Sequence, residues 1–224
     1  MPYTVRKTAA APTLDGQWDS SVWQQAETTT IGIARPESTD HHPKVQVRLL
    51  HDGTSIFGLF RVEDRYIRSV HTRFQDPVCL DSCVEFFCRP QPGTAYFNFE
   101  FNAGGTFLCA QIRDWTRLGK SGFADFTMLG PEAERLVRVH HSLPATVEPE
   151  IAEPTVWTLQ FALPVALLET YAGPLGRLDG RTWTANFYKC GDETSHPHWL
   201  SWAPVPALNF HLPDSFQPIH FAAD

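Results

Sequence analysis

The sequence contains no run of basic residues. Among its 224 residues, 18 Lys and Arg stand against 25 Asp and Glu, which gives a formal net charge of −7 at pH 7. Proteins that bind nucleic acids gather Lys and Arg in a patch or stripe, because the phosphate charges must be neutralised. The charge balance therefore predicts a protein without a nucleic-acid partner.

Long apolar segments are missing as well. The opening Met-Pro-Tyr-Thr-Val-Arg-Lys lacks the apolar stretch of a secretory signal, and no later segment has the length and apolarity of a membrane span. We expect no membrane association and a cytoplasmic protein, or an extracellular or periplasmic one if a signal has been trimmed. Nothing in the sequence indicates an oligomeric state.

Cysteines are few and do not follow a disulfide or zinc-finger pattern. Their number is odd, and their positions are 79, 83, 88, 109 and 190. A single domain of this length has a core large enough to be stable without disulfide bonds. We expect five free thiols, which agrees with a reducing compartment.

Motifs of several enzyme classes are also absent. The chain has no phosphate-binding loop, no Gly-x-Gly-x-x-Gly, no Gly-x-Ser-x-Gly and no His-Glu-x-x-His. Apart from the initiator, the one methionine is Met128, in a stretch without periodicity, so an axial haem ligand is not expected. The sequence predicts a protein that is not an enzyme.

The residues that are present favour one all-β domain over residues 1–224. Hydrophobic residues make up 42%, with 16 Phe and 7 Trp to fill a core, and 18 Pro with 14 Gly imply many loops. A hairpin over 44–62 and further alternating segments predict eight or nine short strands, and 164–171 predicts a short helix. We expect an antiparallel β-sandwich of immunoglobulin-like or jelly-roll type with one or two short helices.

The stretch from 83 to 102 predicts two strands with one apolar and one polar face. In Tyr-Phe-Asn-Phe-Glu-Phe-Asn, residues 96–102, phenylalanines alternate with polar residues, which is the period of a strand with one buried face. In the preceding strand, Glu85 points to one face and its neighbours Val84 and Phe86 point to the other. Three polar side chains should therefore share one sheet face: Glu85, Asn98 and Glu100.

Two later strands are expected to extend this polar face. In 106–113, Leu108, Ala110 and Ile112 alternate with polar residues and should continue the buried face, so that Gln111 and Arg113 point with the glutamates. In 181–189, Trp183, Ala185 and Phe187 should face inward, and Asn186 and Tyr188 outward.

A polar sheet face flanked by aromatic rings suits a sugar. A pyranose offers apolar C–H faces for stacking and a rim of hydroxyl groups for hydrogen bonds. Tryptophans outside the alternating strands supply the candidate rings: Trp115, Trp199 and Trp202. Together with the six polar residues they form the predicted ligand-binding set.

Several motifs in a fixed order carry a resemblance to a known family. They are Leu14-Asp-Gly with Trp23 nearby, Asp81-Ser-Cys-Val-Glu-Phe-Phe, Tyr96-Phe-Asn-Phe-Glu-Phe-Asn with Gly104-Gly105, Trp183-Thr-Ala-Asn-Phe-Tyr, Trp202-Ala-Pro and Phe210-His-Leu-Pro. Over nearly its whole length the chain resembles the family 9 carbohydrate-binding modules, whose architecture the DOMON-type sandwiches share.

The resemblance implies a β-sandwich that binds mono- or oligosaccharides of glucose or xylose type, as in cellulose and xylan, between two aromatic rings. It also implies structural calcium nearby. The sugar-binding carboxylate of the family falls on Glu85, and the polar residues of the next strand fall on Asn98 and Glu100. One aromatic residue of the clamp, six positions before the glutamate, falls on Cys79 instead.

Three alternatives stay open at this point. A glycoside hydrolase would use two carboxyl groups flanking the bond, here Glu85 with Glu100 or Asp81. A protein-interaction module would lack a small ligand. A transition-metal site would draw on the C-terminal part of the chain, with the possible ligands His196, His198 and His211 beside Asp192 or Glu193.

Overall fold

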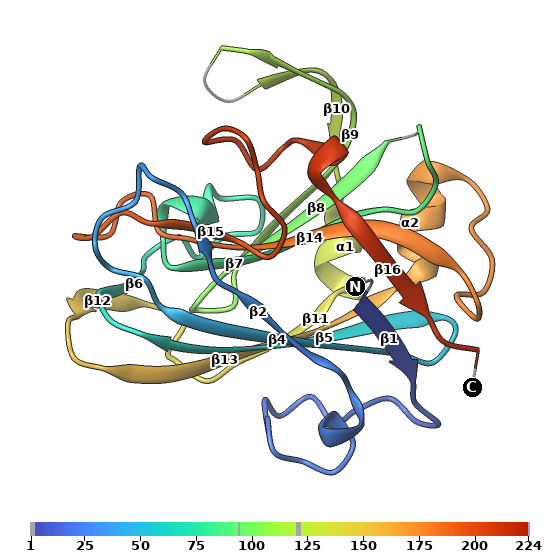
Figure 1. Cartoon of the computed structure of the whole chain (residues 1–224), viewed down its shortest axis with the longest axis horizontal. Helices are drawn as coiled ribbons and strands as arrows, with labels where there is room; N and C mark the ends of the chain where they lie inside the picture. The colour runs from blue at the N-terminus through green and yellow to red at the C-terminus, as the bar shows by residue number, and fades with distance from the viewer. Residues whose placement is uncertain (1–2, 94, 120–121, 224) are drawn as a thin grey trace.

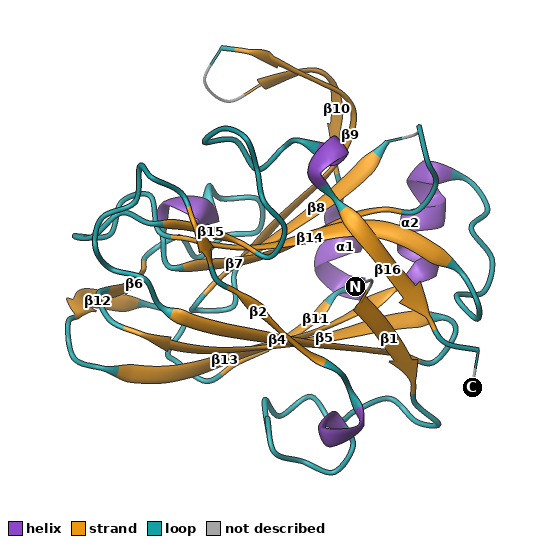
Figure 2. Ribbon diagram, viewed as in Figure 1, coloured by secondary structure: helices purple, strands orange, loops and turns teal. Residues whose placement is uncertain are grey.

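The chain folds into two β-sheets stacked face to face, as a computed structural model of residues 3–93, 95–119 and 122–223 shows (Figure 1). Strands account for most of the regular structure, and the short helices lie at the margins (Figure 2). The predicted antiparallel β-sandwich with short helices is confirmed. In the described part of the chain, no helix has the length and apolarity needed to cross a bilayer.

The first sheet, the upper layer in Figure 1, is antiparallel along most of its width. Its neighbouring strands are β10 (Gly122–Met128), β9 (Phe107–Leu118), β8 (Tyr96–Asn102), β7 (Cys83–Arg89), β14 (Thr182–Cys190) and β16 (Gln217–Phe221). The short β15 (Trp199–Ser201) pairs with β14 and with β3 (Ile33–Ala34).

The second sheet forms the lower layer. It contains β4 (Lys44–His51), β5 (Ser55–Asp64), β13 (Thr155–Pro164) and β11 (Arg138–His141), with β2 (Thr28–Ile31) on the outer edge of β4. The two layers are joined by β1 (Tyr3–Lys7), which pairs in parallel with both β16 and β4. A separate small ribbon pairs β6 (Ile67–Ser69) with β12 (Val147–Ile151).

Short helices complete the structure. They are α1 (Pro131–Leu136), α2 (Val165–Ala172) and the single 3-10 turns η1 (Trp23–Gln25), η2 (Val78–Leu80) and η3 (Pro213–Ser215). The hairpin predicted over 44–62 is β4 and β5, and the helix predicted over 164–171 is α2, so both predictions are confirmed. The segment after Trp115, which has no clear periodicity, holds β10 and α1.

The core between the sheets follows from the alternation in the strands. Side chains that point inward from β7, β8 and β14 are aromatic and fully buried: Phe86, Phe97, Phe99, Phe101 and Phe187. They pack against the inward side chains of the second sheet, with Phe86 stacked on Phe161 at a centroid distance of 5.8 Å. Burial of each such ring stabilises the fold by about 1.5–3 kcal/mol. The two-residue period thus fixes which side of β7 and β8 faces away from the core.

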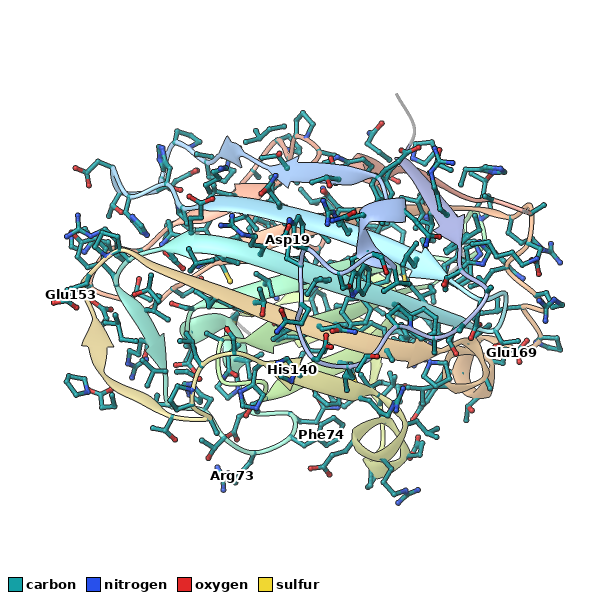
Figure 3. All side chains as sticks on the ribbon, turned by 90° about the horizontal axis from the view of Figure 1, so that it is seen from below. Asp19, Arg73, Phe74, His140, Glu153 and Glu169 are labelled. Carbon is teal, nitrogen blue, oxygen red and sulfur yellow. The ribbon has the colours of Figure 1, made fainter. Side chains whose placement is uncertain are left out.

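The segment before β2 covers the outer face of the second sheet. Figure 3 looks onto this face, and the loop that carries Asp19 crosses over the strands there. Trp23, in the turn η1, is fully buried against Leu50, Phe57 and Leu59. The second sheet is therefore covered on both sides, and the outer face of the first sheet is the one that carries the polar residues.

Candidate functional site

The outer face of the first sheet carries the predicted row of polar side chains. Glu85 of β7 lies directly opposite Glu100 of β8, and Asn98 lies two residues before Glu100 on β8. Tyr188 of β14 lies opposite Glu85 on the other side. Because residues directly opposite on paired strands point to the same face, these side chains share one surface. The predicted face of Glu85, Asn98 and Glu100 is confirmed.

The two glutamates form a buried pair of carboxyl groups. Glu85 is 2% exposed and Glu100 is 6% exposed. Burial, with the nearby Glu100, raises the pKa of Glu85 well above its usual range. Burial also raises the pKa of Glu100 to about 7, although Asn98 Nδ2 donates a hydrogen bond of 2.7 Å to its Oε1. At neutral pH the pair therefore retains part of its protons.

One oxygen of Glu85 has no hydrogen-bond donor. Cys190 Sγ lies 3.2 Å from Oε1 and donates to it. The second oxygen, Oε2, is buried and has no partner among the described residues. A buried polar atom without a partner costs about 1–3 kcal/mol, so native structures leave few of them. Glu85 Oε2 is therefore an acceptor for which residues 3–93, 95–119 and 122–223 supply no donor.

Two tryptophans border the polar row. Trp199 and Trp115 are half-buried and pack on the cluster of side chains that covers this outer face. Trp199 Nε1 donates a 2.7 Å hydrogen bond to Asp192 Oδ1, and the Asp192 charge raises the pKa of both glutamates. Trp115 lies against Tyr96, with 6.1 Å between the ring centroids. Both tryptophans lie on the outer face of the first sheet, and their predicted role as rings that stack on a sugar stays a prediction.

Cys79 of η2 also lies near the carboxyl pair. Its side chain is half-buried and packs on the same outer cluster. Burial, with the charges of Glu100 and Glu85 among the smaller contributions, raises the pKa of its thiol. A small thiol therefore borders the polar row at the position where the family resemblance implies an aromatic ring.

The predicted orientation of Gln111 and Arg113 is wrong. Gln111 lies opposite Phe97, so it points to the inner side of the first sheet, whereas Leu108 lies opposite Glu100 on the outer face. The turn before β9 sets this register. It directs Phe107 and Cys109 inward, whereas Leu108, Ala110 and Ile112, which the alternation predicts to face the core, point outward. Arg113 donates to Gln111 Oε1 at 2.8 Å and pairs with Asp125. Both side chains border a separate hollow of about 190 Å³ beside α2.

Trp202 and Asn186 are not available to a ligand on the polar row. Trp202 packs into the core between the sheets, against Tyr3 and Phe187, so its predicted position beside the row is wrong. Asn186 does face outward, as predicted, but its amide is held by the backbone of Ala203: Oδ1 accepts from the Ala203 N–H at 2.9 Å and Nδ2 donates to its carbonyl at 3.2 Å. Asn186 fixes the chain that follows β15.

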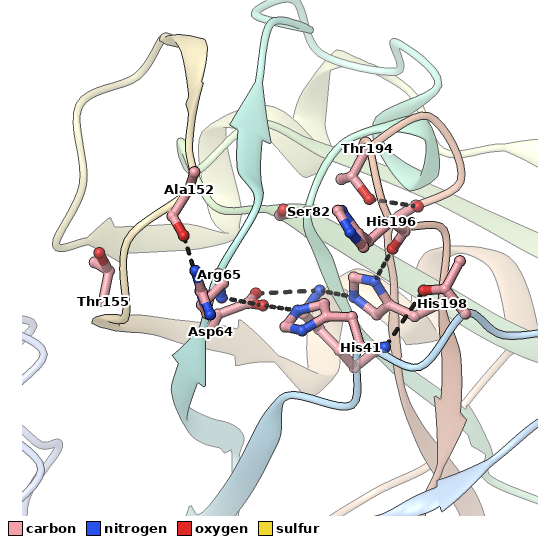
Figure 4. A network of polar contacts seen from close by, with 12 residues as sticks. His41, Asp64, Arg65, Ser82, Ala152, Thr155, Thr194, His196 and His198 are labelled. Carbon is pink, nitrogen blue, oxygen red and sulfur yellow. Dashed lines mark hydrogen bonds and ion pairs between the residues drawn. The ribbon is translucent and has the colours of Figure 1, made fainter.

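A second polar cluster lies between the sheets at one end of the sandwich (Figure 4). Asp64 Oδ1 accepts a 2.8 Å hydrogen bond from His41, and Asp64 Oδ2 lies 3.4 Å from the buried Lys189 ammonium. Lys189 Nζ also lies 2.6 Å from His198 Nε2. Burial and the adjacent Lys189 lower the pKa of His198 to about 3, so its ring is neutral and accepts. Within this cluster the negative charge of Asp64 is therefore paired with the positive charge of Lys189.

The three C-terminal histidines considered as possible transition-metal ligands do not meet at one place. His211 lies on the outer face, where its Nδ1 is 2.8 Å from the Tyr96 hydroxyl, while His196 and His198 adjoin His41 at the end of the core. Calcium, which the family resemblance implies, prefers six to eight oxygen ligands. The two groups of three candidate ligands in the described part of the chain supply mainly nitrogen or sulfur, namely His41–Asp64–His198 and Cys83–Glu85–Cys190. They do not fit calcium.

Sequence reasoning did not single out Asp192 and Cys190 as neighbours of Glu85. The alternation along β14 contains the signal for Cys190, because it lies two residues after Tyr188 on the outward side. Asp192 follows the strand in a loop, and no local pattern indicates its approach to Trp199. All five cysteines are free thiols, as predicted.

The buried carboxyl pair predicts a pH-dependent stability. Because the folded-state pKa of Glu100 is raised from 4.5 to about 7, its contribution is fully present below pH 4.5 and is lost as the pH rises through 7. We expect the free energy of unfolding of the wild type to fall over this window by about 3 kcal/mol relative to Glu100→Gln. Urea denaturation at several pH values measures it, with Glu153→Gln on an exposed loop as the control. Parallel profiles for wild type and Glu100→Gln would contradict the prediction.

Comparisons with solved structures find sandwiches of the same fold. A candidate carbohydrate-binding protein from Bacteroides uniformis superposes with a TM-score of 0.85 at 27% identity, with 98% of each chain covered. A family 9 carbohydrate-binding module from Caldicellulosiruptor kristjanssonii in complex with glucose gives 0.61 at 11% identity, covering 99% of this chain and 96% of the module. The complex with cellotriose gives 0.63 at 12% identity, covering 100% and 95%.

The sequence itself matches a family model over most of its length. No curated protein matches the chain. The model described as Carbohydrate-binding family 9 matches residues 19–221, which include both polar strands, the two flanking tryptophans and Cys79. The chain belongs to carbohydrate-binding family 9.

Proposed function

We propose that the chain binds a glucose-type sugar on the outer face of the first sheet, where a sugar hydroxyl donates to Glu85 Oε2. The observation that carries this proposal is the buried Oε2 atom, which has no donor among the described residues. Supplying a donor to a buried acceptor that has none removes a cost of about 1–3 kcal/mol. A hydroxyl of a bound sugar would supply the donor that the folded chain lacks.

The neighbouring side chains give such a site both kinds of contact that a pyranose needs. Glu100 continues the polar row beside Glu85 and can bond a further hydroxyl, while Asn98, whose Oδ1 accepts from the Ala110 N–H, orients the Glu100 carboxyl group. Trp199 is held by its hydrogen bond to Asp192, so its ring is fixed before a ligand arrives. Rings that are rigid before binding lose little conformational entropy when they stack on the C–H face of a sugar.

The relatives support a sugar ligand of this class. The modules from Caldicellulosiruptor kristjanssonii are in complex with glucose and with cellotriose. We extend the proposal to glucose units at the end of an oligosaccharide, and to xylose, which presents the same ring without the hydroxymethyl group. Cellulose and xylan fragments are therefore the ligands to test.

We propose that this binding is not coupled to catalysis. A glycosidase places its two carboxyl groups on either side of the scissile bond. Here Glu85 and Glu100 lie side by side on one sheet face. Asp81, the other predicted partner, is fully buried, and its carboxylate accepts hydrogen bonds from the Val70 and His71 N–H groups and from Asn102. Its oxygens are committed to holding the loop after β6.

Loss of one Glu85 carboxyl oxygen should weaken sugar binding. Glu85→Gln keeps the volume of the side chain but replaces one oxygen with an NH2 group that cannot accept a hydrogen bond, so we expect an affinity loss of about ten- to a hundredfold. Calorimetric titration with glucose, xylose, cellotriose and xylotriose measures it. Glu153→Gln, on an exposed loop, is the matched control and should bind like the wild type. No heat with any of these sugars, or equal affinity of both variants, would contradict the proposed site.

A ring in place of Cys79 should strengthen sugar binding. The thiol borders the carboxyl pair but is too small to stack on a sugar, whereas an aromatic ring contributes about 0.5–1.5 kcal/mol beyond the area it buries. We expect Cys79→Trp to raise the affinity by about three- to tenfold. Cys79→Ser, which removes the sulfur without adding a ring, is the control. The same titration series would contradict the prediction if the Trp variant bound no better than the Ser variant.

A further inference from the structure

Two clusters of possible metal ligands occur in the described part of the chain, and only one of them contains a positively charged side chain. In the cluster of His41, Asp64 and His198, the ammonium of Lys189 lies between Asp64 Oδ2 and His198 Nε2 and also donates to the Cys190 carbonyl at 2.9 Å. All three of its N–H groups are therefore engaged. This cluster already contains its cation.

The cluster of Cys83, Glu85 and Cys190 contains no cation. Cys83 and Cys190 lie directly opposite each other on β7 and β14, and Glu85 follows Cys83 on the same face. Each of the three residues is buried, and one ligand atom from each lies within 4.8 Å of the others. In the described residues, no ion pair reaches Glu85, Glu100 or Asp192. Three carboxyl groups and two thiols thus meet without an ion pair among the described residues, and the Lys189 ammonium, which pairs with Asp64, offsets their charge only in part.

We propose that Cys83, Cys190 and Glu85 bind a thiophilic divalent cation such as Zn²⁺. The convergence of the two sulfur atoms with the carboxyl group carries the proposal, with Glu85 Oε1, 3.2 Å from Cys190 Sγ, as the oxygen ligand, so that Oε2 remains for a sugar hydroxyl. Thiolate, imidazole and carboxylate are the ligands that zinc uses in proteins, whereas calcium and magnesium avoid sulfur. The ligand set therefore selects a soft or borderline ion.

The geometry needs only small shifts to close around the ion. Zinc lies about 2.3 Å from sulfur and about 2.0–2.2 Å from oxygen, which separates tetrahedral ligand atoms by about 3.5–3.8 Å. Cys190 Sγ and Glu85 Oε1 are 3.2 Å apart, and the spread of the three atoms stays within 4.8 Å. Binding releases the thiol protons, including the one that Cys190 now donates to Glu85. Three protein ligands leave the fourth position to a water molecule.

The first test is titration of the reduced full-length chain with ZnCl₂ in the absence of sugar, so that its result does not depend on the proposed sugar binding. We expect one ion per chain, and Co²⁺ in its place should give the charge-transfer absorption of a cobalt–thiolate bond. Cys83→Ser and Cys190→Ser should each lower the affinity at least about a hundredfold, since loss of a residue that merely orients a ligand already costs 10–100-fold. Cys88→Ser is the matched control, because Cys88 lies on the same strand and faces the core.

A second measurement uses the wild type and stays informative if a serine variant does not fold. X-ray absorption of the zinc-loaded chain counts the neighbours of the ion, and we expect two sulfur atoms with nitrogen or oxygen atoms completing the set. Absence of binding, fewer than two sulfur neighbours, or unchanged affinity in both serine variants would overturn the proposal. A disulfide between Cys83 and Cys190 in the protein isolated without added oxidant would overturn it as well.

Discussion

Two carboxyl groups placed directly opposite each other on neighbouring strands are the constraint on which the polar face depends. Like charges at such positions repel, and burial makes the repulsion stronger because the surroundings screen it less. Three features reduce this repulsion. The carboxyl groups retain protons, the Asn98 amide donates a hydrogen bond to Glu100, and the Cys190 thiol donates one to Glu85. None of these brings a positive charge. The arrangement destabilises the empty protein and favours partners that donate hydrogen bonds or carry positive charge.

The inner face of the first sheet, one residue along β14 from Tyr188, shows the alternative that the fold could have used. Asp64 is equally buried, but the ammonium of Lys189 and the ring of His41 pair it and hold its pKa below the usual range despite the burial. This contact also joins β14 of the first sheet to β5 of the second. One buried carboxylate thus stabilises the junction of the sheets, whereas Glu85 and Glu100 are left for a ligand. Sites that bind are commonly less stable than the scaffold that holds them.

Much of the fold, and part of the site, follows from local patterns in the sequence. The alternation of phenylalanines with polar residues in β8 is strong enough to place Glu85, Asn98 and Glu100 correctly. The face of Gln111 could not be derived in this way, because the turn before β9 shifts which residues point inward, and a shift of one residue exchanges the two faces of a strand. Trp202 and His198 illustrate a second limit: each lies next to a strand of clear pattern, but long-range packing against Tyr3 and Lys189 decides its environment.

The central claim is that the outer face of the first sheet, at Glu85, holds the sugar. A crystal structure of the chain with cellotriose tests it most directly. The account predicts a glucose unit on this face, with a hydroxyl within hydrogen-bond distance of Glu85 Oε2 and a pyranose ring beside Trp199 or Trp115. A sugar in the hollow of about 460 Å³ lined by residues of the segment 8–25, or in the hollow beside α2, with Glu85 Oε2 still lacking a donor, would contradict it.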